Sequence, residues 1–278
     1  MSKQLADIQN GPANIPLDID QVGIKGLTLP LEILDKFRGS QYTVAKIDLN
    51  VDLPSQFKGT HMSRFLEALS LWERKLSYTT VRHLLVSLQK KLNAKNAHVR
   101  FSFPYFIEQC APVSKQTFAM DFESKIEGHL IEDQLIFILQ VKIPVMTVCP
   151  CSLALSKKGA HTQRAVITIT AWIKKFLWLE DLIAIGLKAG SSPVYPLIKR
   201  ADEKEIIDQA FSNPMFVEDV VRNVAKELNH LEHVLWYKVE VESFESIHNH
   251  SAYASIEGEL PESDQARLKL LTKTGQCA

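Results

Sequence analysis

The stretch YTVAKIDLNVDL at residues 42–53 gives the clearest indication of fold class in this chain. Its apolar residues Ile47, Leu49, Val51 and Leu53 are each separated from the next by one aspartate or asparagine. Successive side chains of a β-strand point to opposite faces of a sheet, so this alternation predicts a half-buried strand. The fold therefore contains a sheet with one apolar face.

Helical and strand-like patterns surround this strand. Two runs, from Phe65 to Trp72 and from Val81 to Leu92, place apolar residues at the three- and four-residue spacing of an amphipathic helix. Strand-like runs occur before and after them, at 22–29, 97–107 and 117–126. The first half of the chain thus predicts the order ββααββ.

The second half of the chain repeats this order. Strand-like and helical patterns alternate at 135–148, 163–173, 179–187, 217–228, 233–243 and 251–260. Two successive ββααββ units indicate an internal duplication, and antiparallel strands with paired helices belong to the α+β class. We expect a flexible leader at 1–20, a first unit at 21–132, and a second unit at 133–278 that carries most of the functional motifs.

Charge and cysteine content limit the classes of function. The 32 Lys and Arg residues balance the 32 Asp and Glu residues, so no global field favours nucleic acid or an anionic membrane. Four cysteines in 278 residues do not make a disulfide framework, and the N-terminal residues lack an apolar signal core. We expect a cytoplasmic protein without a nucleic-acid or membrane partner.

A cysteine-rich loop is the first candidate for chemistry. Cys149 and Cys151 flank a proline, and His161 follows ten residues after Cys151. A thiolate and an imidazole can bind one metal ion, and an incomplete protein shell would suit catalysis better than structure. On spacing alone, two small buried cysteines and a surface histidine are about as plausible.

Two further segments carry polar groups with open roles. In the charged run at 199–204, Asp202 or Glu203 could supply an oxygen ligand, and Lys199, Arg200 or Lys204 could contact phosphate. A solvated charged loop is the favoured alternative there. Helix-start signals at Asn213 and Pro214 place Glu218 in an early turn, where it is either a surface acid or a carboxylate that reads a guanine edge.

The segment ESIHNH at 245–250 follows a predicted strand. In extended chain His248 and His250 point to the same side, close to Glu245. Two imidazoles beside a carboxylate suit proton transfer near neutral pH and also suit metal binding. A polar hairpin tip without function is the alternative.

Taken together, these segments resemble the GTP cyclohydrolase IB family, in the order in which that family has them. The matching pieces are Lys58–Arg64, Cys149–Ser152, Gly159–Arg164, Ser192–Lys204, Asn213–Asp219 and Glu245–His250. Each piece is modest, but their joint occurrence over about residues 58–260 is specific. The resemblance implies the tunnelling fold, in which ββααββ units associate into barrels. It also implies a homotetramer with active sites at subunit interfaces.

The resemblance further implies conversion of GTP and water to 7,8-dihydroneopterin triphosphate and formate. The family's metal ligands map onto Cys149, His161 and Glu203, and the metal could be zinc, manganese or iron(II). The family's purine-anchoring carboxylate maps onto Glu218. Its further active-site residues map onto Glu245, His248 and His250, whereas Cys151 could be a metal neighbour, a redox liability or a covalent participant. Candidates for contact with the triphosphate are Lys157, Lys158, Arg164, Lys199 and Arg200.

Two other functions remain as alternatives. A related tunnelling-fold enzyme would act on a pterin or on a deazapurine precursor. A non-catalytic metal-binding assembly protein would use Cys149 and His161 only to hold its structure.

Overall fold

The computed structural model describes residues 9–258, which divide into two compact units. Of these residues, 9–103 and 126–137 form unit 1, and 104–125 and 138–258 form unit 2. Three long strands contribute residues to both units: β4 (Ala97–Cys110), β5 (Thr117–Ile131) and β6 (Gln134–Val148).

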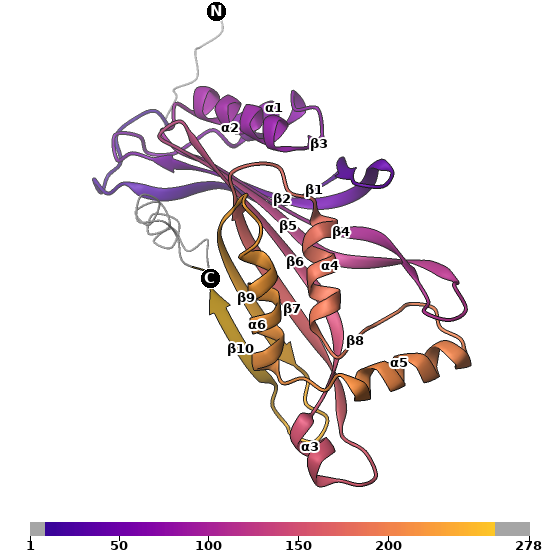
Figure 1. Ribbon diagram of the computed structural model, residues 1–278. Coiled ribbons are helices and arrows are strands. Elements are labelled where there is room, and N and C mark those ends of the chain that lie inside the picture. The colour runs from indigo at the N-terminus through magenta and orange to yellow at the C-terminus, as the bar shows by residue number, and fades with distance from the viewer. Residues whose placement is uncertain (1–8, 259–278) are drawn as a thin grey trace, which may run out of the picture. The chain divides into compact units, whose positions relative to one another are not determined.

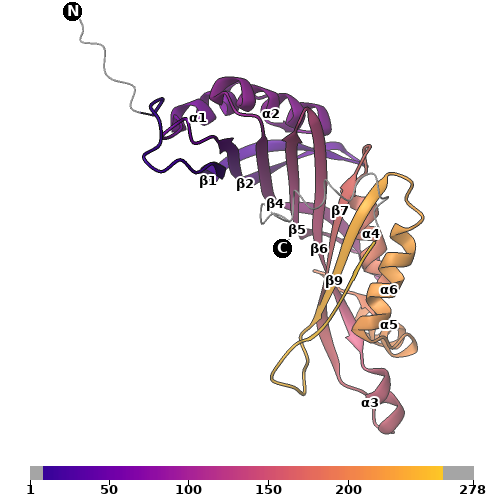
Figure 2. The same cartoon turned by 90° about the vertical axis from the view of Figure 1, so that its left-hand side faces the viewer.

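Unit 1 is a sheet with two helices on one face. Its strand order is β3-β1-β2-β4-β5-β6, and α1 and α2 lie together over one side of it (Figure 2). The paired strands β1 and β2 are antiparallel, whereas the short β3 runs parallel to β1. The remaining bounds in this unit are β1 (Ile19–Asp35), β2 (Gly39–Leu53), α1 (Met62–Ser70), β3 (Lys75–Leu76) and α2 (Tyr78–Leu92).

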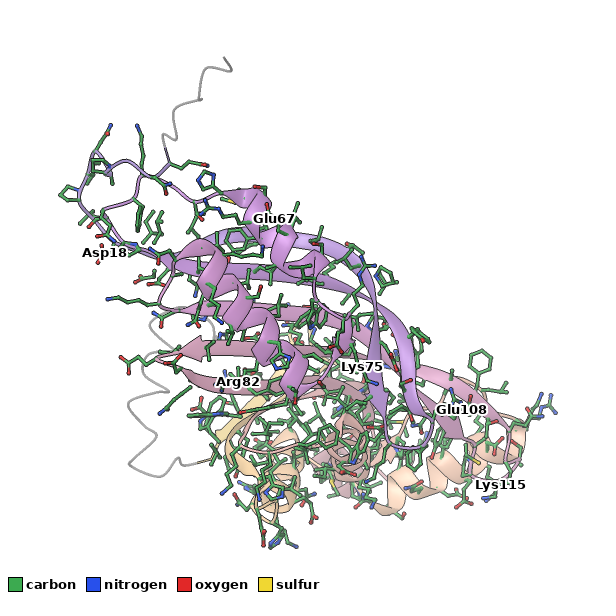
Figure 3. All side chains as sticks on the ribbon, turned by 90° about the horizontal axis from the view of Figure 1, so that it is seen from above. Asp18, Glu67, Lys75, Arg82, Glu108 and Lys115 are labelled. Carbon is green, nitrogen blue, oxygen red and sulfur yellow. The ribbon has the colours of Figure 1, made fainter. Side chains whose placement is uncertain are left out.

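The core of unit 1 follows from the alternation in β2. Ile47 and Leu49 are fully buried, and they face the same layer as the buried leucines of α2, whereas exposed residues such as Glu67 and Arg82 lie on the outer helix surface (Figure 3). A Cβ atom at Gly128 on β5 would lie 2.6 Å from a methyl group of Val81. Glycine at this position therefore allows α2 to pack closely against the sheet.

Unit 2 is built on the strand order β4-β5-β6-β7-β9-β10, with the short β8 paired to β6. Helices α4 and α6 lie side by side over one face of this sheet (Figure 1), and α6 is amphipathic with a buried valine stripe. The bounds are α3 (Pro150–Leu155), β7 (Thr162–Ile173), α4 (Leu179–Ala189), β8 (Ser192–Pro193), α5 (Arg200–Ser212), α6 (Val217–Leu228), β9 (Val234–Ser243) and β10 (Ala252–Glu257).

The structure confirms the α+β class and the predicted order of the main strands and helices. The predicted helix at 217–228 agrees with α6, and the strand predicted at 42–53 lies within β2. The strand predicted at 251–260 contains β10, although its last two residues lie outside the described range. The division into two consecutive repeats, 21–132 and 133–278, stays a prediction.

Two helices of unit 2 were not predicted as such. Helix α3 is a single short segment that begins at Pro150, and it is too short to show an apolar period. Helix α5 is largely charged, and Asp202 and Ala210 are its only buried residues. Because helix prediction relies on an apolar face, a helix that buries so little resembles a loop in sequence.

The expected leader at 1–20 can be described only from residue 9 onward. Residues 9–18 contain neither helix nor strand, and β1 begins at Ile19. The backbone N–H of Ala13 donates to Ser55 at 3.1 Å, and that of Lys58 donates to Gly11 at 2.6 Å. This part of the predicted leader is therefore hydrogen-bonded to the segment after β2. Among the described helices, none has the length and apolar character that crossing a bilayer requires.

Candidate active site

A pocket of about 350 Å³ in unit 2 gathers six of the predicted site residues, Cys149, His161, Glu218, Glu245, His248 and His250. It is formed where β6, β7 and β9 end or begin, together with the start of α6 and the segment that joins β9 to β10. Its lining consists of Thr147, Cys149, His161, Gln163, Met215, Phe216, Val217, Glu218, Ser243, Glu245, His248, His250, Ala252 and Tyr253.

Cys149 enters the pocket because β6 ends immediately before it. It caps the short helix α3, and its sulfur accepts a hydrogen bond from the Ser152 backbone N–H at 3.4 Å. Its own backbone N–H donates to the carbonyl of His161 at 3.2 Å. The loop predicted to bring a thiol and an imidazole to one place thus does so, with both residues on the lining of one pocket.

His161 belongs to a hydrogen-bonded group that crosses three strands. Its Nδ1 lies 2.8 Å from Oε1 of Gln163 and 3.5 Å from Oε2 of Glu245. The Gln163 amide nitrogen lies 3.3 Å from Oε1 of Glu245 and 3.3 Å from the hydroxyl of Thr147. Thr147 in turn contacts the hydroxyl of Ser243 at 3.2 Å. We refer to these five residues as the His161 network.

Glu245 has an incompletely satisfied carboxylate. The His161 and Glu245 side chains are each 13% exposed, so both are largely removed from water. Within the described part of the chain, Oε2 of Glu245 is buried and has no hydrogen-bond partner. Such an oxygen is costly unless it has a role, because a buried polar atom loses its bonds to water. It is suited to accept a proton or to meet a cation.

His248 and His250 lie between β9 and β10, on the same pocket as Glu245. Their rings stack with centroids 5.2 Å apart and an interplanar angle of 22°. Both side chains are exposed, which leaves them free to contact a bound molecule. The two rings do lie side by side as predicted, but residues 246–250 form bends rather than the extended chain on which the prediction relied.

Glu218 lines the pocket from the first turn of α6 and is exposed. The predicted helix start at Asn213 and Pro214 is wrong, because α6 begins at Val217. Asn213 instead ends α5, with its backbone N–H bonded to Ala210, and Met215 bonds to the carbonyl of Val148 at 3.1 Å. That bond keeps the segment before α6 against the end of β6, and so places Glu218 at the pocket.

Several predicted residues do not line this pocket. Cys151 is exposed on α3. Arg164 lines a separate groove of about 680 Å³, which shares Tyr253 with the pocket. Lys199, Arg200 and Glu203 are exposed at the start of α5. Over residues 9–258 of a single chain, no three His, Cys, Asp or Glu side chains come close enough to hold a metal ion.

Asp202 has a structural role that separates it from its neighbour Glu203. It is fully buried, and its carboxylate accepts backbone N–H bonds from Val113, Ser114 and Lys199, each at 2.8 Å. Burial alone would raise the pKa of this carboxyl, but these hydrogen bonds hold the pKa below its ordinary value. Of the two acids considered as an oxygen ligand, only Glu203 remains available.

Sequence reasoning missed Gln163, Thr147 and Ser243 as members of the site. Gln163 is two residues from His161 and enters β7, so strand periodicity places both side chains on one face. That periodicity was the available signal. The cross-strand partners Thr147 and Ser243 had none, because their contacts depend on which strands are neighbours.

Comparisons with known proteins agree with the motifs. A family model described as type I GTP cyclohydrolase folE2 matches residues 5–254. The chain is 52% identical over 252 residues to GTP cyclohydrolase FolE2 of Maridesulfovibrio salexigens. The alignment covers 91% of this chain and 98% of that protein. It is 47% identical over 255 residues to GTP cyclohydrolase FolE2 of Syntrophus aciditrophicus, and the alignment covers 92% of this chain and 100% of that protein.

Solved structures show a wider likeness in fold. A uricase from Bacillus fastidious superposes with a TM-score of 0.53 at 7% identity, covering 90% of this chain and 95% of that one. A hyperthermostable urate oxidase from Bacillus sp. TB-90 gives 0.53 at 7% identity, with 86% and 99% covered. At this identity the likeness concerns the fold alone. On its sequence, the chain belongs to the type I GTP cyclohydrolase FolE2 family.

Proposed function

We propose that this chain opens the imidazole ring of GTP at the unit 2 pocket, releasing formate and leaving 7,8-dihydroneopterin triphosphate. The observation that carries this proposal is the convergence of Cys149, His161, Glu218, Glu245 and the His248–His250 pair on one pocket. Its support from sequence is the family match over residues 5–254. The product would enter pterin and folate biosynthesis.

Glu218 is proposed to read the guanine base. A carboxylate accepts hydrogen bonds but donates none, so it pairs with the ring N1–H and the exocyclic amine of guanine. Adenine has an unprotonated N1 next to its amine and cannot offer two donors to the same carboxylate. The proposal is supported by the position of Glu218, which lines the pocket and is exposed.

Enzymes of this family generally depend on a divalent metal. The donor types at the pocket suit such an ion, because Cys149 and His161 line it together and a buried Glu245 oxygen has no hydrogen-bond partner in the described residues. We propose Cys149, His161 and Glu203 as the residues that would hold zinc, manganese or iron(II). When bound, such an ion lowers the pKa of water toward neutrality.

Glu203 does not line the pocket, and within residues 9–258 of one chain no three candidate ligands come together. Its helix is joined through Asp202 to the loop between β4 and β5, so its position depends on that loop. Metal analysis of a Glu203 variant decides whether it is a ligand.

The remaining chemistry consists of proton transfers. Water must add to C8 of the base and lose a proton, and Glu245 can receive it on its unpartnered oxygen. The bond from C8 to one ring nitrogen then breaks, and His248 or His250 can donate a proton to N7 or N9. A second water then cleaves the remaining bond between C8 and nitrogen and releases formate. Later opening, rearrangement and closure of the ribose need the same groups again, because each step moves protons between carbon, nitrogen and oxygen. Cys151 has no assigned step.

The triphosphate needs cations that the pocket itself does not supply. Among the described residues that line it there is neither lysine nor arginine. We propose Arg164, Lys199 and Arg200 as phosphate contacts, with Arg164 nearest in sequence to the His161 network and Lys157 and Lys158 as further candidates. These roles are carried from the family resemblance, and charge-removing variants test them.

The protein is also proposed to work as a homotetramer of tunnelling-fold barrels with active sites between subunits. Exposed apolar side chains occur at and beside the pocket: Phe216 is 40% exposed, Phe244 48%, Ile247 65% and Tyr253 58%. Exposed apolar groups gathered at one place are typical of contact with another protein surface. Sedimentation of the purified protein measures the assembly. The cytoplasm remains the expected compartment.

The deciding experiment is to incubate purified protein with GTP and Mn²⁺ and to measure formate together with fluorescent oxidised neopterin. Formate release that stops with EDTA supports the proposal. Metal-replete, folded protein that leaves GTP intact but acts on a pterin or a deazapurine precursor would instead favour a related tunnelling-fold enzyme. Unfolding on metal removal would favour the assembly protein.

A further inference from the structure

The His161 network determines which ring nitrogen of His161 carries the proton. An ionised Glu245 has only acceptor atoms, so the Gln163 atom that faces its Oε1 at 3.3 Å must be the amide nitrogen. The second amide proton points to the Thr147 hydroxyl, also at 3.3 Å. The orientation of the Gln163 amide is thus fixed by two acceptors, Thr147 on β6 and Glu245 just after the end of β9.

With its nitrogen so used, Gln163 presents only its carbonyl oxygen to His161. That oxygen lies 2.8 Å from Nδ1, and a carbonyl can only accept, so Nδ1 must be protonated. Oε2 of Glu245 lies 3.5 Å from the same Nδ1. In an ionised carboxylate this oxygen can accept a hydrogen bond but cannot donate one. The Gln163 carbonyl therefore favours the Nδ1–H tautomer, which leaves the Nε2 lone pair unprotonated and able to bind a cation.

The network is anchored where side chains cannot easily turn. Thr147 and Ser243 are each 1% exposed, and their hydroxyl oxygens lie 3.2 Å apart. They come from β6 and β9, and Gln163 lies on β7 between those two strands. A glutamine tied to both flanking strands holds its carbonyl in place better than a free surface side chain would.

We infer that Gln163 is a positioning residue that holds His161 in the Nδ1–H tautomer and, through its amide, holds Glu245 beside it. This inference rests on the proposed function in that His161 is taken as a metal ligand. A partner that accepts from the second nitrogen of a ligating histidine fixes its tautomer and orientation, and its loss typically lowers metal affinity about 10- to 100-fold.

The test compares Gln163→Leu and Gln163→Glu with a matched control, Gln140→Leu. Gln140 lies on β6, and its amide donates to the Thr170 hydroxyl of β7 at 2.9 Å, so it makes the same kind of cross-strand bond away from the pocket. Zn²⁺ affinity is measured by chelator competition without GTP. We expect a loss of about 10- to 100-fold in Gln163→Leu and none in Gln140→Leu.

Gln163→Glu separates the accepting role from a general packing role. A glutamate at this position can still accept from Nδ1 of His161, but it meets the Glu245 carboxylate where the amide donated, so this variant should retain more Zn²⁺ affinity than Gln163→Leu while losing some. Gln163→Leu with unchanged affinity would overturn the inference. So would a Gln163→Glu variant that loses as much affinity as Gln163→Leu.

A second measurement needs neither metal nor GTP. Long-range ¹⁵N–¹H correlation spectra of histidine-labelled, metal-free protein report the tautomer of His161, with its signal identified by a His161→Gln variant. We expect protonated Nδ1 in the unchanged protein and a loss of that preference in Gln163→Leu. Protonated Nε2 as the main form would refute the inference even if GTP is consumed. If GTP is left intact while Nδ1 is protonated, only the proposed function fails.

Discussion

Each unit of this protein places a histidine beside a carboxylate on its sheet, but the two carboxylates are neutralised differently. In unit 1, Arg100 donates to Oε1 of Glu127 at 2.7 Å, and Nε2 of His129 lies 3.4 Å from Oε2. In unit 2, Oε1 of Glu245 meets the neutral amide of Gln163. Within residues 9–258, a fixed guanidinium thus accompanies the Glu127 carboxylate and none accompanies that of Glu245.

The surroundings differ in the same sense. His129 is 1% exposed and His98 is 3% exposed, and their Nδ1 atoms lie 3.1 Å apart, so both rings are enclosed by protein. The His161 network instead lines a pocket. Arginine balances the negative charge of the first carboxylate within the protein, so that group is structural. A buried carboxylate without a fixed cation needs a ligand, a metal ion or a proton to balance its charge.

The pKa of Glu127 shows how unit 1 stabilises the charged form of its carboxylate. Burial alone would raise the pKa of this carboxyl, but His129 and Arg100 together hold it below its ordinary value. The charge of Glu127 is therefore permanent near neutral pH and unavailable for proton transfer. The comparison teaches that a histidine and a carboxylate in contact are not sufficient to indicate catalysis.

The largest expected effect comes from removing the proposed ligands. Cys149→Ala, His161→Ala or Glu203→Ala should lower metal content and GTP turnover together, and turnover should fall to background for a true ligand because the ion that activates water is lost. Metal analysis of the purified variants by mass spectrometry measures this directly. If Glu203→Ala keeps its full metal content, Glu203 is not a ligand and the third position belongs to another group.

A smaller effect is expected for the stacked histidines. His248→Ala and His250→Ala should lower the rate by about a hundredfold to ten-thousandfold, the usual contribution of general acid–base groups, while the metal stays bound. Comparing turnover number with metal content in the same preparation separates the two roles. A His248 variant that loses metal as completely as Cys149→Ala would make His248 a ligand.

Glu218→Ala should weaken GTP binding while changing folding little. Two lost hydrogen bonds to a charged acceptor correspond to about 1.5–3 kcal/mol each, whereas an acid at a helix start contributes about 0.3–1 kcal/mol to stability. Calorimetric titration with a non-hydrolysable GTP analogue measures the binding. Affinity equal to that of the unchanged protein would remove Glu218 from the site.

The smallest effect concerns the stability of unit 1 and its dependence on pH. Burial, and then the charge of His129, lower the pKa of His98 to about 3. The unfolded chain binds this proton near pH 6.5, so stability contributed by neutral His98 is present above that pH and is lost as pH falls toward 3. The loss between pH 7 and pH 5 should be about 2 kcal/mol.

Urea unfolding at pH 7 and pH 5 measures this loss, and His98→Gln should remove it from the difference. The lowered pKa values of Glu127 and Asp202 do not interfere, because carboxyl groups in the unfolded chain titrate mainly below pH 5. An identical pH dependence in His98→Gln and the unchanged protein would mean that His98 is not the responsible group.

Much of this fold was accessible from sequence because its periodicities are strong. The alternation at Ile47–Leu53 and the valine stripe of α6 each predicted an element that the structure contains. By contrast, α5 has almost no apolar face, and the signals at Asn213 and Pro214 mark the end of one helix rather than the start of the next. Local residue preferences do not reveal which neighbour a loop packs against.

The site was predictable to the extent that its residues are close in sequence or belong to a motif. Cys149 and His161 flank one loop, and Glu245 and His250 flank another, so local chain geometry brings each pair together. Gln163, Thr147 and Ser243 meet only because β6, β7 and β9 are neighbours in the sheet. Strand order is a long-range property that no local pattern encodes.

The most direct test of the central claim compares the same substitution in the two units, His161→Gln in unit 2 and His129→Gln in unit 1. Formate release from GTP and metal content are measured for both, at a temperature where circular dichroism shows each variant to be folded. We predict that His161→Gln loses metal and activity, whereas His129→Gln keeps both and is only less stable. A folded His129→Gln without activity, or a His161→Gln that turns over GTP at the original rate, would contradict the account.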